Sequence, residues 1–355
     1  MKYFALFGIM LLLGPTHANS CTIFKTTQSE KTLVGNNEDW VEANGKVWFL
    51  TAVPGKRGRV LFGFENGWAQ GGMNDQGLFF DGIAGEVQDW APASHREDFP
   101  GNLCEMILEK VATVDDAIAY FERYNFPSLV VGRFVFIDAT GSTAAISYVG
   151  GRLNIERFAE STVALGYRGE EARDLLNDAH DIDVQAMANI LKVCQRRDEY
   201  STQYSNVYDP LGLKVHVYPS SGAVREVTLN LEQELAKEDH YYDLASLSEQ
   251  MGKELIVDHK TRPAVKYLSS SLDDCIGQYG LDTSSVTITR SGNSLLLRSE
   301  LIFEAVMAFE IVPVAEDHFY ARHLAIEVEF QRNRLEQIEA LLLAYDGRVF
   351  SLKRK

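Results

Sequence analysis

The sequence has 355 residues, of which 46% are hydrophobic and 24% are charged, and its formal net charge is -16. This is the composition of a globular protein with enough chain for a large core and a second, smaller one. The acidic balance and the lack of a basic cluster exclude a general nucleic-acid-binding protein. Four cysteines are too few for a disulfide-built scaffold, and the eight histidines show no metal-binding spacing. We therefore expect no metal and no cofactor.

The first twenty residues have the pattern of an export signal. A positive residue at position 2 is followed by an apolar run that ends at Leu13, and Ala18 and Ser20 place small residues at the two positions that a signal peptidase reads. The apolar run is too short to span a bilayer. We predict that residues 1–20 are a signal peptide, that cleavage leaves Cys21 as the first residue, and that the mature chain is secreted or periplasmic.

Two other fates of this N-terminus stay open. An uncleaved signal would leave the chain tethered to the membrane. A lipoprotein would carry its lipid on Cys21, although bacterial lipid-attachment sites usually have leucine three residues before the cysteine, where this chain has Ala18. A membrane is expected as a partner only if Cys21 is lipidated.

Strand and helix patterns alternate along the chain up to residue 258. Alternating apolar residues and turn-forming residues predict strands at 22–27, 31–34, 46–53, 60–64, 78–81, 133–138, 144–149, 152–157, 162–165, 203–208, 213–218 and 226–231. Helical periodicity predicts helices at 102–111, 170–179 and 183–193, and a further helix that begins with a capping box at Thr113 and Asp116. Residues 72–77 are predicted to form the turn before the strand at 78–81. Because hairpins dominate, we predict an α+β fold in which antiparallel sheets are covered by helices.

The pattern changes after residue 258. Residues 259–267 are expected to form a linker, and residues 268–355 carry strand patterns with a hairpin signal at Tyr345-Asp-Gly347. We expect this last segment to form a small all-β domain. It contains no cluster of catalytic residue types, so a stabilising or docking role is expected for it.

A chain that begins with Cys21 has a nucleophile and a base on one residue. The unperturbed pKa of a thiol is about 8.5, and that of an α-amino group is about 7.7–8.0. The free amine can therefore accept the thiol proton, directly or through a water molecule. A peptide nitrogen is not a base, so cleavage before Cys21 would also be the activating step.

Two segments place this chemistry in a family context, Cys21-Thr-Ile-Phe24 and Gly35-Asn-Asn-Glu-Asp-Trp40. Together they resemble the start of the N-terminal-nucleophile (Ntn) hydrolases, in the branch of choloylglycine (bile salt) hydrolase, penicillin V acylase and the penicillin acyltransferase-like amidases. The resemblance implies a four-layer αββα sandwich, expected here over residues 21–258. It also implies that Asp39 binds and orients the α-amino group of the cysteine. The alternative interpretation of the second segment is a polar turn.

The resemblance continues at Gly72-Met-Asn-Asp-Gln-Gly-Leu78 and at Tyr204-Ser-Asn-Val-Tyr-Asp209, which are similar to fold markers of the family. In the family, a backbone N–H shortly after the first marker helps to form the oxyanion hole. That position is Ala84 in this chain, and such a donor stabilises the tetrahedral oxyanion. Asn36 and Asn37, within the cysteine-facing motif, are further candidates for shaping the site.

The chain departs from the family pattern at three positions. Asn36 stands where the bile salt and penicillin V enzymes have arginine, and Gly166 stands where the family has an asparagine that donates to the oxyanion. The late active-site arginine has no clear counterpart, because Arg225 lies in a different context. Asn206 and Asn74 are the candidates to replace the missing donor.

These features predict an enzyme that hydrolyses a linear, non-peptide C–N amide of a small N-acyl substrate through an acyl-thioester on Cys21. Trp40 and Trp68 are expected to line an acyl pocket, and Cys104 and Cys194 are expected to be small buried hydrophobic residues.

Two alternatives to this function stay open. One is an N-acyltransferase, in which an amine replaces water; the other is a surface lipoprotein whose inactive Ntn-like body binds a ligand or partner. A homo-oligomer also stays open.

Overall fold

The computed structural model describes residues 20–41, 44–179, 181–220, 226–258, 260–261, 272–281, 284–299 and 307–355. The predicted signal peptide, apart from Ser20, lies outside these ranges, as do most of the predicted linker and Arg225. Within the described ranges, no helix is both long and apolar enough to cross a membrane. No group of three His, Cys, Asp or Glu side chains in these ranges is arranged to hold a metal ion.

The first of two large sheets contains the hairpin that follows Cys21. Its strand order is β12-β1-β2-β13-β14-β15, and each neighbouring pair is antiparallel. The strands are β1 (Thr22–Gln28), β2 (Lys31–Asp39), β12 (Thr162–Gly166), β13 (Thr202–Asp209), β14 (Lys214–Pro219) and β15 (Val227–Asn230). The loop between β1 and β2 consists of Ser29 and Glu30, with φ values of 49° and 68°. Positive φ at both loop residues is typical of the tightest hairpin turn, which sets the register of the two strands.

The second sheet has the order β11-β10-β9-β6-β5-β4-β3-β16 and is also antiparallel. Its strands are β3 (Gly45–Leu50), β4 (Arg59–Phe64), β5 (Ala69–Asn74), β6 (Phe79–Ala84), β9 (Gly132–Ile137), β10 (Thr143–Val149), β11 (Arg152–Phe158) and β16 (His240–Asp243). Shorter elements lie around the two sheets: β7 (Glu97–Asp98), β8 (Tyr124–Asn125), α5 (Leu231–Leu235), α6 (Leu247–Gln250), and single 3₁₀ turns at Pro127–Val130, Leu244–Ser246 and Asp273–Cys275.

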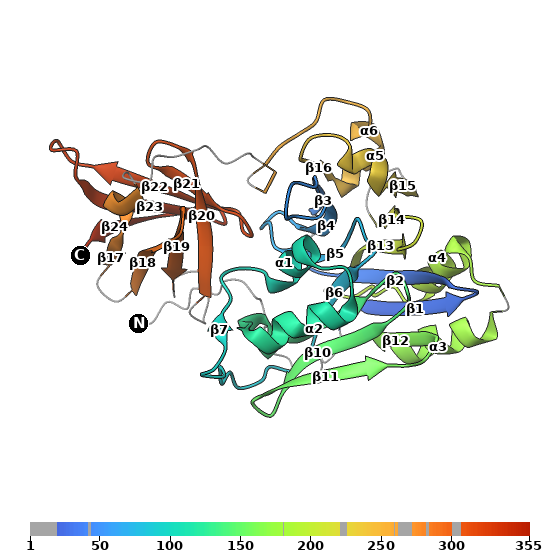
Figure 1. The fold of residues 1–355 in the computed structure, drawn as a ribbon. Coiled ribbons are helices and arrows are strands. Elements are labelled where there is room, and N and C mark those ends of the chain that lie inside the picture. Colours follow the sequence, from blue (N-terminus) through green and yellow to red (C-terminus); the bar gives the residue numbers. More distant parts are fainter. Residues whose placement is uncertain are drawn as a thin grey trace.

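Four longer helices cover the sheets. They are α1 (Leu103–Lys110), α2 (Val114–Arg123), α3 (Gly169–Asp178) and α4 (Val184–Val193). The predicted N-cap of α2 is confirmed, since Thr113 Oγ1 accepts from the N–H of Asp116 at 3.2 Å; the Asp116 carboxylate accepts from the Thr113 hydroxyl at 2.7 Å, in place of the backbone N–H that a capping box would use. Figure 1 shows α1 and α2 on a different side of the sheets from α3 and α4.

Three apolar clusters separate the layers. The cluster between the sheets combines side chains of both, such as Val34 and Val217 from the first and Phe62 and Phe79 from the second. A second cluster packs the other face of the second sheet against α1 and α2 and includes Cys104. A third packs the first sheet against α3 and α4 and includes Cys194. The layers are therefore helices, sheet, sheet, helices, and the predicted α+β class is confirmed.

The strand β5 is missing from the sequence-based prediction. Gly71 and Gly72 give this segment a weak strand pattern, and the predicted turn at 72–77 overlaps its last residues. The turn is in fact shorter and is organised by Asn74, whose Oδ1 accepts from the N–H groups of Gln76 and Leu78. The Asn74 amide nitrogen donates to two carbonyl groups at the end of α1. Asn74 therefore ties the second sheet to its covering helix.

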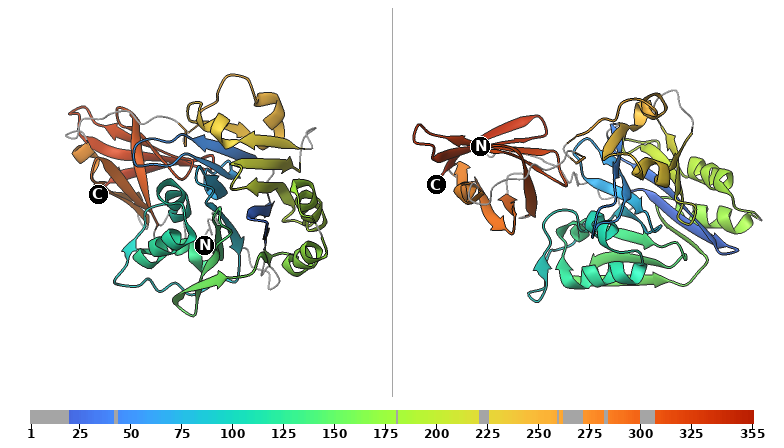
Figure 2. Two further views of the ribbon diagram at one scale, coloured as in Figure 1. Left: turned by 45° about the vertical axis from the view of Figure 1, so that its right-hand side comes forward. Right: turned by 45° about the horizontal axis from the view of Figure 1, so that its top comes forward.

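The C-terminal segment forms a closed barrel. Its order is β17-β18-β19-β20-β21-β22-β23-β24, and pairing of β17 with β24 closes it. The strands are β17 (Gly277–Leu281), β18 (Ser284–Ser291), β19 (Ser294–Ser299), β20 (Met307–Ala315), β21 (His318–Ala321), β22 (Ile326–Arg332), β23 (Ile338–Tyr345) and β24 (Arg348–Arg354). The barrel has its own apolar core, and both views of Figure 2 show it beside the two-sheet body. A C-terminal all-β unit was predicted and is present; its boundaries with the linker stay a prediction.

Candidate active site

Cys21 immediately precedes β1 and is buried, with 4% of its surface exposed. Its φ is 58°, which is uncommon for a residue other than glycine. The backbone N–H donates to Asp39 Oδ2 at 3.1 Å, and the carbonyl oxygen accepts from the N–H of Tyr167 at 2.7 Å. Contacts from β2 on one side and from the segment after β12 on the other therefore fix the backbone of Cys21.

Asp39 is the last residue of β2, and the hairpin register places it beside the start of β1. Thr22 pairs with Asn37, so the residues after Asn37 lie next to Cys21. The other carboxylate oxygen of Asp39 accepts from Thr202 Oγ1 at 2.6 Å. Burial raises the pKa of Asp39 to about 6, although the hydrogen bonds from Thr202 and Cys21 lower it. The structure thus brings together the two residues predicted as catalytic.

Glu38 is a third member of this cluster, and sequence analysis did not single it out. The Cys21 thiol donates to Glu38 Oε1 at an S···O distance of 3.7 Å. Glu38 is 3% exposed, and its Oε2 has no hydrogen-bond partner within the described structure. Burial, followed by the charge of Asp39, raises the pKa of Glu38 to about 8. The pKa of the Cys21 thiol is also raised, by burial and then by the three carboxyl groups of Glu38, Asp39 and Asp81.

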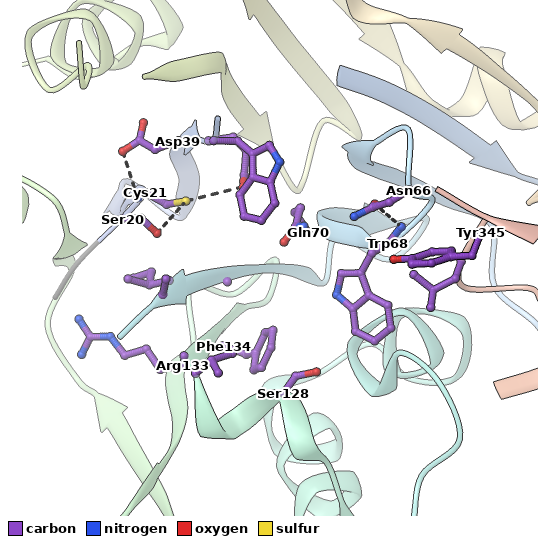
Figure 3. A pocket seen from close by; sticks show the side chains of 18 residues that line it. Ser20, Cys21, Asp39, Asn66, Trp68, Gln70, Ser128, Arg133, Phe134 and Tyr345 are labelled. Carbon is purple, nitrogen blue, oxygen red and sulfur yellow. Dashed lines mark hydrogen bonds between the residues drawn. The ribbon is translucent and has the colours of Figure 1, made fainter. Parts of the chain in front are cut away.

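A cavity of about 130 Å³ begins at the thiol. In Figure 3, Cys21, Asp39 and Arg133 lie toward one end of it, and Trp68 and Tyr345 lie toward the other. Trp40 and Phe134 contribute aromatic surface to the wall, and Trp40 and Trp68 both line the cavity, as predicted. A mainly apolar cavity with a few polar groups at one end is typical of a site for a small molecule.

Ala84 lies at the end of β6 and lines the same cavity as Cys21. Its position agrees with the predicted role of its backbone N–H, and that role stays a prediction. The two candidate replacement donors lie elsewhere. Asn206 is fully buried, does not line the cavity, and donates through Nδ2 to the Tyr208 hydroxyl at 3.1 Å. Asn74 is committed to the turn and to α1, so neither amide is placed near the thiol.

Asn36 and Asn37 support the site without lining the cavity. Successive side chains of β2 point to opposite faces of the sheet. Asn36 points toward the second sheet, where its Nδ2 donates to Asp81 Oδ2 at 2.6 Å. Asn37 points toward the helices, where its Nδ2 donates to the carbonyl oxygen of Leu191 at 3.0 Å and its Oδ1 accepts from Ser205 Oγ at 2.6 Å. The two asparagines therefore hold β2, and with it Glu38 and Asp39, between the neighbouring layers.

Gly166 pairs with Thr22 across β12 and β1 and has a φ of 87°. A Cβ at this position would overlap the carbonyl oxygen of Cys21. No asparagine can stand here without moving the backbone of the cysteine. The departure from the family pattern at residue 166 is thus explained by the close approach of the two strands.

Two further charged residues at the site escaped the sequence analysis. Asp81 is fully buried in β6, and burial together with the charge of Glu38 raises its pKa. The sequence did contain a sign of its importance, because a carboxylate within an otherwise apolar strand requires a polar partner. Arg133 lines the cavity near the start of β9. Nothing in its sequence surroundings distinguishes it from an ordinary surface arginine.

The fold is structurally similar to that of the Ntn hydrolases. A variant of conjugated bile acid hydrolase from Clostridium perfringens matches over 68% of this chain and 99% of its own, with a TM-score of 0.52 and 13% sequence identity. A second variant of that enzyme matches over 63% and 97%, with the same TM-score and identity. These matches establish the fold, while the sequences have diverged widely.

A penicillin V acylase from Agrobacterium tumefaciens also matches, over 63% of this chain and 86% of its own, at 13% identity and a TM-score of 0.46. No family model matches the sequence, and no curated protein matches it. The bile acid hydrolase is covered almost completely, whereas about a third of this chain has no counterpart in it. That third is large enough to contain the whole C-terminal barrel.

Proposed function

We propose that this protein is an exported amidase whose nucleophile is Cys21, made active by removal of residues 1–20. It would hydrolyse a linear, non-peptide C–N amide of a small N-acyl compound. One observation carries the proposal. The Cys21 nitrogen lies 3.1 Å from Asp39 Oδ2 while the thiol of the same residue faces the aromatic cavity. After cleavage, this nitrogen would be an α-amine already held by a carboxylate.

The proposed reaction begins with transfer of the thiol proton of Cys21 to its own α-amine. The thiolate attacks the amide carbonyl carbon, and the backbone N–H of Ala84 is proposed to stabilise the resulting oxyanion. The α-ammonium returns its proton to the leaving nitrogen as the C–N bond breaks, which leaves an acyl-thioester and a free amine. Water then attacks the thioester with the α-amine as base and releases the acid. Asp39 stabilises the protonated amine in both steps.

The burial of Cys21 supports this proposal over a lipoprotein. The strand β1 starts at the next residue, and the cysteine is fixed by hydrogen bonds to Asp39 and Tyr167. A lipid on this thiol would have to leave a buried site with no flexible tether between it and the sheet. Export to a secreted or periplasmic location rests on residues 1–20 alone.

The state of residue 21 tests the proposal. Exported protein would be analysed by intact mass and N-terminal sequencing, and then assayed against a panel of N-acyl amines, N-acyl amino acids and phenoxyacyl penicillins. We expect a free N-terminal Cys21, turnover of at least one amide, and loss of turnover in Cys21→Ser. A diacylglyceryl group on the cysteine would overturn the proposal. Release of the acyl group to an added amine and not to water would assign an acyltransferase.

A further inference from the structure

The cavity that begins at Cys21 ends on the C-terminal barrel. Leu324, just before β22, and Tyr345, the last residue of β23, line it together with residues of the two-sheet body. Figure 3 shows Tyr345 beside Trp68 and Asn66, at the end away from the thiol. The barrel therefore supplies part of the wall of the candidate active site.

Backbone and apolar contacts hold this part of the barrel against the body. The N–H of Ala325, next to Leu324, donates to the carbonyl oxygen of Asn66 at 2.7 Å. Trp68 packs against the apolar core of the barrel and also against the cluster that joins the second sheet to α1 and α2. The side chain of Asn66 accepts from the N–H of Trp68 at 3.0 Å. The turn at residues 66–68 thus connects the two-sheet body to the barrel at the barrel end of the cavity.

A buried ionic cluster fixes the same segment from a second direction. Lys260 Nζ lies 2.7 Å from Glu105 Oε2, with the two side chains 1% and 3% exposed. His323 Nδ1, one residue before Leu324, lies 3.1 Å from the same oxygen. The nearby positive charges of Lys260 and His323 hold the pKa of Glu105 well below its usual value despite its burial. Through His323, this cluster ties the residue next to Leu324 to α1 of the two-sheet body.

The chemical character of the cavity changes along its length. The charged groups that line it are Glu38, Asp39 and Arg133, and the latter two lie at the Cys21 end in Figure 3. The barrel end is formed by Trp68, Leu324 and Tyr345, which present mainly apolar surface. A ligand that places a polar amide at the thiol and an uncharged apolar group toward the barrel matches this distribution.

We propose that the barrel determines which substrates the enzyme accepts. In this proposal the acyl group of the substrate lies in the cavity between Cys21 and the barrel, and Leu324 and Tyr345 close the barrel end of that cavity and limit the length of the acyl group. This inference rests on the proposed function for the identity of the ligand. It assigns a direct role to the C-terminal barrel in a chain of which about a third is not covered by the similar bile acid hydrolase.

The test uses full-length exported protein and thiol reagents, so that it does not depend on amide turnover. Cys21 would be alkylated with iodoacetamide and with N-alkyl iodoacetamides of increasing chain length, and the rate for each would be followed by intact mass. Leu324→Trp fills the barrel end of the cavity. We expect it to lower the rate for long-chain reagents about 10-fold or more relative to iodoacetamide. Tyr345→Leu, which shortens the side chain at the wall, should change the long-to-short ratio in the opposite direction.

Leu335→Trp is the matched control, because Leu335 is a barrel residue that is 76% exposed and lies away from the cavity. It should leave all rates unchanged, and near-UV circular dichroism would check that both tryptophan variants are folded. Equal long-to-short ratios in Leu324→Trp, Tyr345→Leu and the control would overturn the inference. So would a Cys21 that even iodoacetamide cannot reach in the native protein.

The failure of the proposed function is a separate result. If no amide is hydrolysed but the alkylation ratios shift as expected, the barrel is a wall of the pocket and the amidase proposal fails. If amides are hydrolysed and the acyl-length profile is the same in wild type, Leu324→Trp and Leu335→Trp, the amidase stands and the role of the barrel fails.

Discussion

The carbonyl oxygen of Cys21 lies so close to Gly166 that a Cβ at position 166 would overlap it. Gly166 also has a φ of 87°, which side-chain-bearing residues rarely adopt. The close contact forms because β1 and β12 pair as neighbours, with Gly166 opposite Thr22. The glycine is therefore required for the observed placement of Cys21, and the absence of a side-chain donor at position 166 follows from it.

Gly166→Ala should be clearly more destabilising than an alanine substitution at a glycine with open surroundings. Gly150 has a φ of 57° and no heavy atom within 4 Å of a built Cβ, so Gly150→Ala reports backbone strain alone. We expect a loss of about 1 kcal/mol in the free energy of unfolding for Gly150→Ala. Gly166→Ala should lose roughly 1–3 kcal/mol more, because the Cβ also displaces Cys21. Urea denaturation of both variants checks this, and equal losses would contradict it.

Asp39→Asn should lower the catalytic rate while leaving the fold intact. The amide can keep one hydrogen bond, but it removes the negative charge that would stabilise the protonated amine of a processed Cys21. We expect turnover to fall by about 100-fold or more, with little change in the rate at which substrate analogues bind. Asp89→Asn is the control, since Asp89 is exposed and does not line the cavity. A turnover close to that of wild type would remove Asp39 from the proposed mechanism.

Ionisation of Glu38 should limit the rise of Cys21 reactivity at alkaline pH. The pKa of Glu38 is raised to about 8, so the carboxyl group is neutral below that pH and becomes negative above it. A negative carboxylate 3.7 Å from the sulfur disfavours the thiolate. Glu38→Gln keeps the size of the side chain and removes the titration. Iodoacetamide labelling measured from pH 6 to 10 should show the variant overtaking wild type above pH 8; parallel profiles would disprove the effect.

The same carboxyl group should also appear in the pH dependence of stability. Its pKa is 4.5 in an exposed chain and about 8 when buried here. The folded state therefore binds the proton more tightly than the unfolded state, and stability is lost as pH rises from 4.5 to 8. The slope for one such group is at most about 1.4 kcal/mol per pH unit. Wild type should lose stability relative to Glu38→Gln across this range in urea titrations, and a constant difference would argue against burial of an ionisable Glu38.

The Glu105–Lys260 pair should be far more important for stability than a surface pair. Lys260→Met leaves Glu105 buried without its nearest cation, and breaking such a pair costs about 3–5 kcal/mol. The double variant Glu105→Gln, Lys260→Met should recover part of the loss. Arg157 and Asp115, which are 57% and 77% exposed, form the reference pair, and removing either should cost at most about 1 kcal/mol. Equal costs for the two pairs would show that the contact near the barrel is not a fixed ionic cluster.

Sequence analysis located most of the strands because their signals are local. The strand pattern at 22–27 and 31–34 corresponds to β1 and β2, whose two-residue loop fixes their register. The strand β5, which the sequence analysis missed, has little local pattern of its own, since Gly71 and Gly72 have no side chains to alternate. Its pairing is determined by β4 and β6 on either side. A strand that is stabilised by its neighbours more than by its own residues leaves a weak signal in the sequence.

For the site, the resemblance of the motif from Gly35 to Trp40 to the family pattern was enough to predict that Asp39 lies beside Cys21, and the structure places the two within hydrogen-bond distance. Sequence alone did not show which polar residue of β2 meets the thiol. Asn36 and Glu38 are two residues apart and so lie on the same face of the strand, but Asn36 donates to Asp81, 45 residues away, while Glu38 was overlooked and faces the thiol. Which of the two reaches the cavity depends on the register of β2 against β1, which places the residues after Asn37 next to Cys21.

The amino-acid sequence by itself determined the strand-turn-strand that begins at Cys21, the carboxylate at its end, and an all-β segment at the C-terminus. These follow from periodicity, turn residues and a motif, all of which act over short distances along the chain. Only the tertiary structure decided that residue 166 must be glycine, that Glu38 faces the sulfur while Asp81 binds Asn36, and that the barrel ends the cavity at Leu324 and Tyr345. Those features arise from contacts between segments far apart in the sequence, such as Asn66 and Ala325, whose packing no local pattern encodes.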